Sequence, residues 1–337
     1  MKKLIFCLLL LLPATADIAI AAEKSAFREK AIPLAVLPTE MVNNRTVIHL
    51  PVANYFLHMV FDTGASNTAL FQSADFAFDD LKKTGPAKIL FPALNEAVEG
   101  SRLAPIPIKF GDHTYMPQKL LLIHKRPPVG DRLNFKFDGV LGQDFFSSYV
   151  VEFDPTAHLV RLYSAGTNLR RHYFTRLRLH MKQSAPHIVF NTQLPWEKHS
   201  SFKKLLLDTG FPGLMVIWNE RHFSMAAGQS NIKTYQKENR GVFTRATFKL
   251  GKLKFMRAPI FIASNVPQQA QKRDGLIGAN ILNQFNHVID FGNKQLLLDA
   301  GRFQFDRIDG HFYVPNNETF IYKNFKNFEA ASKFVIE

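Results

Sequence analysis

The sequence contains a single cysteine, Cys7, which lies in the apolar segment that opens the chain. A chain cleaved after this segment has no cysteine, which excludes disulfides, a cysteine nucleophile and thiolate metal sites. After the first dozen residues no uncharged apolar run is long enough to span a bilayer, so we expect no transmembrane segment in the mature chain. Such a protein must be stabilised by its hydrophobic cores alone.

The first 21 residues have the pattern of a secretory signal peptide. Lys2 and Lys3 give a positive start, an apolar run follows over 4–12, and the segment 19–21 (Ala-Ile-Ala) is a small-x-small cleavage site. The apolar run is short for a membrane anchor, so we expect cleavage near residue 21. The segment resembles a bacterial secretory signal, and this resemblance implies a periplasmic or secreted protein.

Positive charge and phenylalanine are abundant. The 42 Lys and Arg against 28 Asp and Glu give a formal net charge of +14, and 32 phenylalanines contribute to a hydrophobic fraction of 46%. This composition predicts well-buried cores, and 337 residues suffice for two domains. The charge is compatible with weak affinity for anionic surfaces, although basic residues scattered for solubility explain it more simply. No nucleic-acid partner is expected.

The chain repeats itself. An apolar run leads into Asp-Thr-Gly in FLHMVFDTGASNTAL (56–70) and again in KKLLLDTGFPGLMV (203–216). Each half then has a glycine-containing turn region, followed by DGVLGQDFFSSYVVEFDPTAHLVRLY (138–163) or DGLIGANILNQFNHVIDFGNKQLLLD (274–299). Three matched features in the same order predict two homologous lobes.

The local patterns are those of strands and turns. Strands are predicted over 47–52, 55–61, 188–190 and 205–207, and hairpins pair 150–153 with 159–163 and 288–291 with 296–298. Short helices are predicted over 143–148 and 279–285. The expected organisation is a signal peptide (1–21), a lead-in (22–44), a first lobe (45–165), a second lobe (173–300) and a C-terminal extension (301–337).

The two tripeptides, Asp62-Thr63-Gly64 and Asp208-Thr209-Gly210, fit one chemical purpose. Each glycine allows a tight turn and leaves room for a second carboxylate to approach. Each threonine hydroxyl is placed to lock the two turns together across an interface.

These motifs resemble those of the retropepsin-like aspartic peptidases, in a bacterial form with two fused lobes as in pepsin-like enzymes. In that family two aliphatic residues and a glycine on a later strand support each turn. By this resemblance, Gly142 and Gly278 are the glycines of the two supporting strands. The resemblance implies an all-β fold of two homologous retropepsin-like acid-protease lobes with a cleft between them. It also implies that Asp62 and Asp208 are catalytic, with no metal and no cofactor.

The implied function is that of an aspartic endopeptidase, which hydrolyses peptide bonds with water activated between Asp62 and Asp208. Two carboxylates a few ångströms apart do not both ionise easily, so the pair holds one proton. The ionised member takes a proton from water and the protonated member donates to the carbonyl oxygen. A peptide or protein is the expected substrate. The chain is expected to be a monomer, because two internal lobes make homodimerisation unnecessary.

The second turn departs from the family pattern. Ala65 follows the first glycine, but Phe211-Pro212 follows the second, where small and hydroxyl residues are usual. Neither turn has a hydroxyl there to bond the aspartate's outer oxygen, so we expect a raised pH optimum. The bulk of Phe211 leaves open an alternative, a non-catalytic protein on the same fold that binds a peptide or a polyanion.

Two β-hairpin flaps are predicted around 99–101 and 239–241, with turns at Gly100 and Gly241.

Other kinds of catalytic or metal site find less support in the sequence. A serine nucleophile lacks its G-x-S-x-G elbow, and no carboxylate pair other than the two aspartates suggests a glycosidase. Four histidines remain as candidate metal ligands, namely His172, His180, His187 and His199. They have no recognised metal-binding spacing, so we expect them to be surface residues of strands.

Overall fold

The computed structural model describes most of the chain between residues 31 and 325. The described ranges are 31–91, 96–124, 137–170, 173, 175–182, 185–218, 223–225, 234–235, 241–263, 274–299, 310–313 and 319–325. Pro33–Glu337 make up one unit of the chain. The predicted signal peptide lies outside the described residues, as does most of the predicted C-terminal extension. Within the described ranges, no helix has the length and apolar character needed to cross a membrane.

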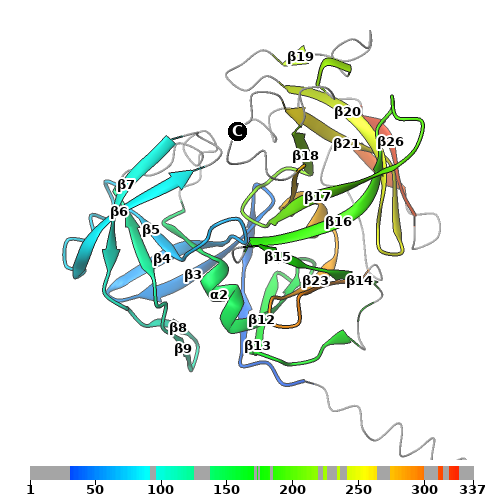
Figure 1. Ribbon diagram of the computed structural model, residues 1–337. Coiled ribbons are helices and arrows are strands. Elements are labelled where there is room, and N and C mark those ends of the chain that lie inside the picture. The colour runs from blue at the N-terminus through cyan, green and yellow to red at the C-terminus, as the bar shows by residue number, and fades with distance from the viewer. Residues whose placement is uncertain are drawn as a thin grey trace, which may run out of the picture. The chain divides into compact units, whose positions relative to one another are not determined.

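A ten-stranded sheet forms from the first half of the chain (Figure 1). Its path is β6-β7-β10-β5-β11-β4-β3-β8-β9, and β2 pairs with β3 beside this path. The strands are β2 (Glu40–Val42), β3 (Arg45–Val52), β4 (Tyr55–Phe61), β5 (Ala69–Phe71), β6 (Lys83–Phe91), β7 (Glu96–Leu103), β8 (Ile108–Phe110), β9 (His113–Tyr115), β10 (Leu120–Ile123) and β11 (Gly139–Leu141).

The second half builds a ten-stranded sheet along the path β19-β20-β16-β17-β22-β18-β21-β26-β25, with β15 paired to β16. The parallel pairing of β17 with β22 repeats that of β4 with β11. The strands are β15 (His180–Lys182), β16 (Ala185–Gln193), β17 (Ser201–Asp208), β18 (Met215–Trp218), β19 (Thr234–Tyr235), β20 (Gly241–Leu250), β21 (Leu253–Ala263), β22 (Gly275–Gly278), β25 (Gly310–Tyr313) and β26 (Thr319–Phe325).

A third sheet, of six strands, is shared by the two halves in the order β1-β13-β12-β23-β24-β14. Its central pairing joins β12 to β23, with Val151 opposite Ile289. Its strands are β1 (Ala35–Pro38), β12 (Tyr149–Asp154), β13 (Leu159–Ser164), β14 (Thr175–Arg178), β23 (Asn286–Asp290) and β24 (Gln295–Asp299). Both predicted hairpins are therefore present, and they meet in this sheet.

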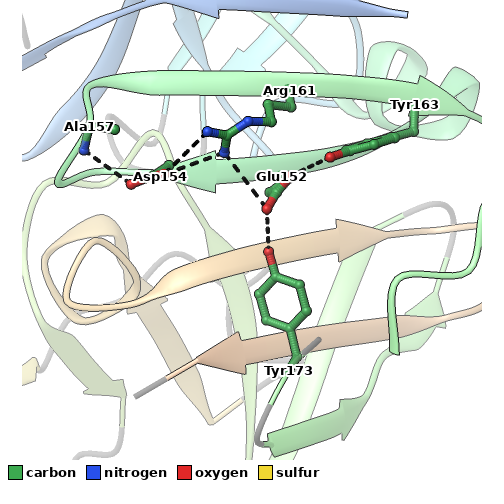
Figure 2. A network of polar contacts seen from close by, with 6 residues as sticks. All are labelled: Glu152, Asp154, Ala157, Arg161, Tyr163 and Tyr173. Atoms are coloured by element: carbon green, nitrogen blue, oxygen red, sulfur yellow. Dashed lines mark hydrogen bonds and ion pairs between the residues drawn. The ribbon is translucent and has the colours of Figure 1, made fainter. Parts of the chain in front are cut away.

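Polar side chains tie the first of these hairpins to Tyr173, which lies shortly before β14 (Figure 2). Glu152 on β12 accepts hydrogen bonds from the hydroxyls of Tyr163 at 2.5 Å and Tyr173 at 2.7 Å. Arg161 on β13 forms ion pairs with Asp154 at 3.3 Å and with Glu152 at 3.8 Å. Glu152 thus joins three separate positions of the chain.

The core of the first lobe is rich in phenylalanine. Phe61, at the end of β4, packs edge-on against Phe153 and beside Phe145, with ring centroids 5.4 and 5.8 Å apart. All three side chains are buried. Burying one such side chain contributes about 1.5–3 kcal/mol, so the residue before the first Asp-Thr-Gly is firmly anchored.

The prediction of an all-β protein with two similar lobes is confirmed. The two predicted helices are also present, as α2 (Gln143–Ser148) and α4 (Ala279–Leu282), the second of them shorter than expected. β26 pairs in parallel with β21, so the described part of the C-terminal extension joins the second sheet.

The predicted turn at Gly100 is wrong. Gly100 lies within β7, opposite Ala87 on one side and Ile123 on the other. A Cβ at this position would lie 2.5 Å from the carbonyl oxygen of Leu122, so the glycine permits close packing of strands. β6 and β7 are antiparallel neighbours, and residues 92–95 between them lie outside the described residues. Gly241 is the first residue of β20, and residues 239 and 240 also lie outside.

Candidate active site

Each Asp-Thr-Gly lies at the end of a buried strand and rests on a second strand. The backbone N–H of Asp62 donates to the carbonyl of Leu141 at 3.0 Å, which continues the parallel pairing of β4 with β11. Asp208 is the last residue of β17 and lies opposite Gly278 of β22. The supporting strands predicted from the later D-G-x-x-G segments therefore lie beside the two turns.

Both aspartates are held by their own turns in the same way. Oδ1 of Asp62 accepts hydrogen bonds from the N–H groups of Gly64 at 2.8 Å and Ala65 at 3.1 Å. Oδ1 of Asp208 accepts from Gly210 at 3.1 Å and Phe211 at 3.0 Å. Phe211 thus supplies the same backbone contact as Ala65, and its bulk leaves the geometry of the second turn intact.

The two carboxyl groups lie at the interface between the turns. A Cβ on Gly64 would lie 2.7 Å from Cγ of Asp208, and a Cβ on Gly210 would lie 2.3 Å from Cγ of Asp62. Both distances are shorter than any carbon–carbon contact allows, so each carboxyl group occupies the space that the opposite glycine leaves open. The two carboxyl groups therefore face each other across the interface, and Asp208 influences the pKa of Asp62.

The threonines lock the two turns together through buried hydrogen bonds. The N–H of Thr63 donates to Oγ1 of Thr209 at 3.0 Å, and the N–H of Thr209 donates to Oγ1 of Thr63 at 3.1 Å. Each hydroxyl then donates at 2.7 Å to a carbonyl of the opposite strand, that of Leu207 or Phe61. This network agrees with the role predicted for the two threonines.

The glycines of the supporting strands let the turns approach closely. A Cβ on Gly142 would lie 2.4 Å from the carbonyl carbon of Asn67, and one on Gly278 would lie 2.2 Å from the carbonyl oxygen of Gly213. The residues after each aspartate thus pack directly on these glycines. Larger side chains would push the turns away from the strands behind them.

Burial raises the pKa of Asp62 above its ordinary value. The N–H groups of Gly64 and Ala65, the positive charge of Arg45 and the hydrogen bond with Asp208 act in the opposite direction. Neighbouring carboxyl groups of this kind influence each other's ionisation, so the two titrations belong to the pair.

Arg45 is a member of the site that the sequence patterns do not reveal. It is 4% exposed, and its Nε donates to the carbonyl of Gly210 at 2.7 Å. Its guanidinium carbon lies 5.6 Å from the centre of the Phe137 ring. Burial lowers the pKa of Arg45, and the charges of Asp62 and Asp208 oppose that shift. A cation is thereby placed next to both turns.

Two further polar residues brace the turns from outside the motifs. Nε2 of Gln143, the first residue of α2, donates to the carbonyl of Thr63 at 2.9 Å. Nδ2 of Asn44 donates to the carbonyl of Pro212 at 3.2 Å. The available signals were Asn44, directly before β3, and Arg45, the first residue of β3, but neither residue type is diagnostic alone.

The predicted absence of a metal site stays a prediction. His172 lies outside the described residues. His180 and His187 face each other across β15 and β16, but neither they nor His199 belong to a group of three metal-ligand residues in the described ranges. The group found there consists of other residues, Glu40, His49 and His58.

No protein-family model and no curated protein matches the sequence. Among solved structures, the crystal structure of an aspartic proteinase from Irpex lacteus matches with a TM-score of 0.55 and 15% sequence identity. The match covers 79% of this chain and 96% of that chain. The chain has the fold of an aspartic proteinase. At this identity the match shows the fold alone, so any activity has to be argued from the site itself.

Proposed function

We propose that this protein is an aspartic endopeptidase in which Asp62 and Asp208 activate water for the hydrolysis of peptide bonds. The observation that carries the proposal is the reciprocal packing of each carboxyl group against the opposite glycine, Gly64 or Gly210. This packing brings the two carboxyl groups to one interface, which supports a pair that shares one proton. An aspartic proteinase needs the same arrangement for its chemistry.

The proposed mechanism uses only groups at the two turns. One carboxylate accepts a proton from a water molecule held between Asp62 and Asp208, and this water attacks the carbonyl carbon of the peptide bond. The other carboxyl group donates its proton to the carbonyl oxygen. As the tetrahedral intermediate collapses, the carboxylate takes a proton back from one of the hydroxyls of this intermediate and the C–N bond breaks. The other carboxyl group donates its proton to the leaving nitrogen, which restores the pair. Neither a metal nor a covalent intermediate is required.

A working pH above the strongly acidic range is part of the proposal. Ala65 and Phe211 give Asp62 and Asp208 backbone N–H donors, but neither residue has a hydroxyl that could add a hydrogen bond to the charged form. Burial also raises the pKa of Asp62. Both influences move ionisation of the pair towards higher pH.

The substrate is proposed to be a peptide or protein outside the cytoplasm. The pattern over residues 1–21 motivates the location, as a periplasmic or secreted protein. The chain is proposed to act as a monomer, because it supplies both aspartates itself. The net charge of +14 adds at most weak affinity for anionic surfaces.

The test compares the mature wild-type chain with Asp62→Asn and Asp208→Asn on a library of quenched fluorescent peptides. Asparagine has nearly the same shape as aspartate but cannot ionise, so each variant should lose at least about a thousandfold in kcat/KM, in keeping with loss of acid–base catalysis. Pepstatin, which mimics the tetrahedral intermediate, should inhibit the wild type. Circular dichroism and thermal unfolding show whether the variants remain folded.

Cleavage that survives in the folded Asp208→Asn variant would overturn the shared pair. A wild type that binds peptides or polyanions without cleaving any peptide across pH 3–8 would instead support the non-catalytic alternative. That alternative drew on the bulk of Phe211. The N–H of Phe211 nevertheless bonds Asp208 as the N–H of Ala65 bonds Asp62, which favours the catalytic proposal.

A further inference from the structure

The first lobe carries a cluster of metal-ligand residues on three neighbouring strands. His49 of β3 and His58 of β4 lie directly opposite each other in the antiparallel ladder. Glu40 of β2 lies opposite Val47 of β3, two residues before His49. Because side chains two residues apart on a strand share a face, all three side chains belong to the same face of the sheet.

The side chains in this cluster are close together and open to solvent. Oε1 of Glu40 lies 2.7 Å from Nε2 of His49, and the imidazole rings of His49 and His58 have centroids 4.2 Å apart. One ligand atom from each of the three lies within 4.8 Å of the other two. Ligands of a tetrahedral zinc ion are about 3.3 Å apart. Rotation of exposed side chains is sufficient to close this difference.

A buried carboxylate orients one of the histidines. Oδ2 of Asp138 lies 3.0 Å from Nδ1 of His58 and also accepts the backbone N–H of His58 at 2.9 Å. Asp138 is only 5% exposed, so its position is fixed. When Nδ1 carries the proton and donates it to the carboxylate, Nε2 carries the lone pair. Metal-binding histidines are usually held by a carboxylate in this way.

The second lobe shows which of these contacts the fold itself needs. Asp274 occupies the place of Asp138, and its Oδ2 accepts the backbone N–H of Lys204 at 2.6 Å. The residue opposite Lys204 is Val189. The contact between aspartate and backbone is therefore common to both lobes, whereas the histidine pair and its glutamate belong to the first lobe alone. The architecture does not require them.

We propose that Glu40, His49 and His58 form a binding site for a divalent transition-metal ion, with Zn²⁺ as the best match. Two imidazoles and one carboxylate are a common zinc ligand set, and water completes the tetrahedron at an exposed site. Asp138 acts as the outer carboxylate that orients His58. The site does not include Asp62 or Asp208, so metal binding can be tested independently of the proposed peptidase activity.

Metal binding at this site would brace the support of the first catalytic turn. His58 lies on β4, which ends at Phe61 directly before Asp62, and Asp138 directly precedes β11, which pairs with β4. An ion would also link β2 to β3 and β4. The site is therefore structural in character, and its expected effect is on the stability of the first lobe.

The test is isothermal titration calorimetry of Zn²⁺ into the mature chain, freed of metal with a chelator and carrying no histidine tag. The expected result is one ion per chain with a micromolar or lower Kd, and an increase in Tm with saturating Zn²⁺. His49→Ala, His58→Ala and Glu40→Gln should each weaken binding by about tenfold or more. His199→Ala, which removes an exposed histidine of the second lobe, is the matched control and should bind like the wild type.

Substitution with Co²⁺ gives an independent readout, because tetrahedral Co²⁺ absorbs visible light far more strongly than octahedral Co²⁺ does. The band should appear with the wild type and with His199→Ala, and should be lost with His58→Ala. A wild-type Kd in the millimolar range would overturn the proposal. So would equal Zn²⁺ affinity in the wild type and in folded His49→Ala.

Discussion

The carboxyl group of Asp62 lies in the space that a side chain on Gly210 would need, with Cγ only 2.3 Å from the position of such a Cβ. The same relationship holds in reverse between Asp208 and Gly64, at 2.7 Å. Glycine is thus required in each motif because the aspartate of the other motif occupies the space that a side chain would need. A sequence motif that appears local is in fact a contact between the two lobes.

Gly210→Ala should therefore separate the two carboxyl groups. The added methyl group has to displace Asp62 or the second turn, and we expect peptidase activity to fall by at least about a hundredfold, as expected when reacting groups move by about 1 Å. Gly292→Ala is the matched control, because its Cβ would meet its nearest neighbour at 3.5 Å. Peptide hydrolysis and thermal unfolding are measured for both. Equal activities in the two variants would contradict the packing relationship.

Thr63→Val should weaken the connection between the lobes. Valine keeps the shape of threonine but leaves the buried N–H of Thr209 without its acceptor, and it also removes the bond to the carbonyl of Leu207. A buried donor left unpaired costs about 1–3 kcal/mol, so the free energy of unfolding should fall by that amount. Urea denaturation followed by tryptophan fluorescence measures the change. Thr63→Ser retains the hydroxyl and should be closer to the wild type; an equal loss in both variants would argue against the network.

Arg45→Met should move the pH profile of peptide hydrolysis to higher pH. The charge of Arg45 lowers the pKa of Asp62, so its removal raises that pKa and shifts the acid limb of kcat/KM upward. The lost hydrogen bond to the carbonyl of Gly210 should also reduce kcat. Arg178→Met removes an exposed arginine from the six-stranded sheet and should leave the profile unchanged. An unshifted acid limb in Arg45→Met would show that Arg45 has only a packing role.

His287 should make the protein less stable in acid. This side chain is fully buried and stacks on Phe153, and burial lowers its pKa from 6.5 to about 4. Between these values the unfolded chain binds more protons than the folded one, so stability falls as pH drops through this window. The loss approaches about 3 kcal/mol near pH 4. His287→Leu should show a flatter dependence on pH in urea denaturation between pH 7 and 4, and an unchanged slope would contradict the assignment.

The two Asp-Thr-Gly turns were predictable because their signal is local and repeated. Asp62 and Asp208 each follow an apolar strand, and each half has its own D-G-x-x-G segment, so the two copies support each other. The hairpins that meet in the shared sheet were predictable for the same reason. The pairing of β12 with β23 was not, because nothing in either hairpin specifies which strand lies at its open edge.

Other features depend on register and packing that a single sequence does not contain. Arg45 is identified only when the turn at Gly210 is seen to lie against it. Gly100 resembles a turn residue, whereas its function is to let β7 approach the carbonyl of Leu122. His49 and Glu40 are nine positions apart, and strand pairing alone places their side chains together. In each case the residue that makes the contact is distant in the sequence, or belongs to no recognisable motif.

The six-stranded sheet has a consequence for dividing this protein into parts. β12 is bordered by β13 of its own half and by β23 of the other. A gene fragment encoding only the first half would leave the backbone N–H and C=O groups along Val150–Phe153 without the partners that β23 supplies. An open edge of this kind attracts another strand, so the excised half should self-associate through β12 and acquire from a second copy the neighbour that the intact chain provides internally.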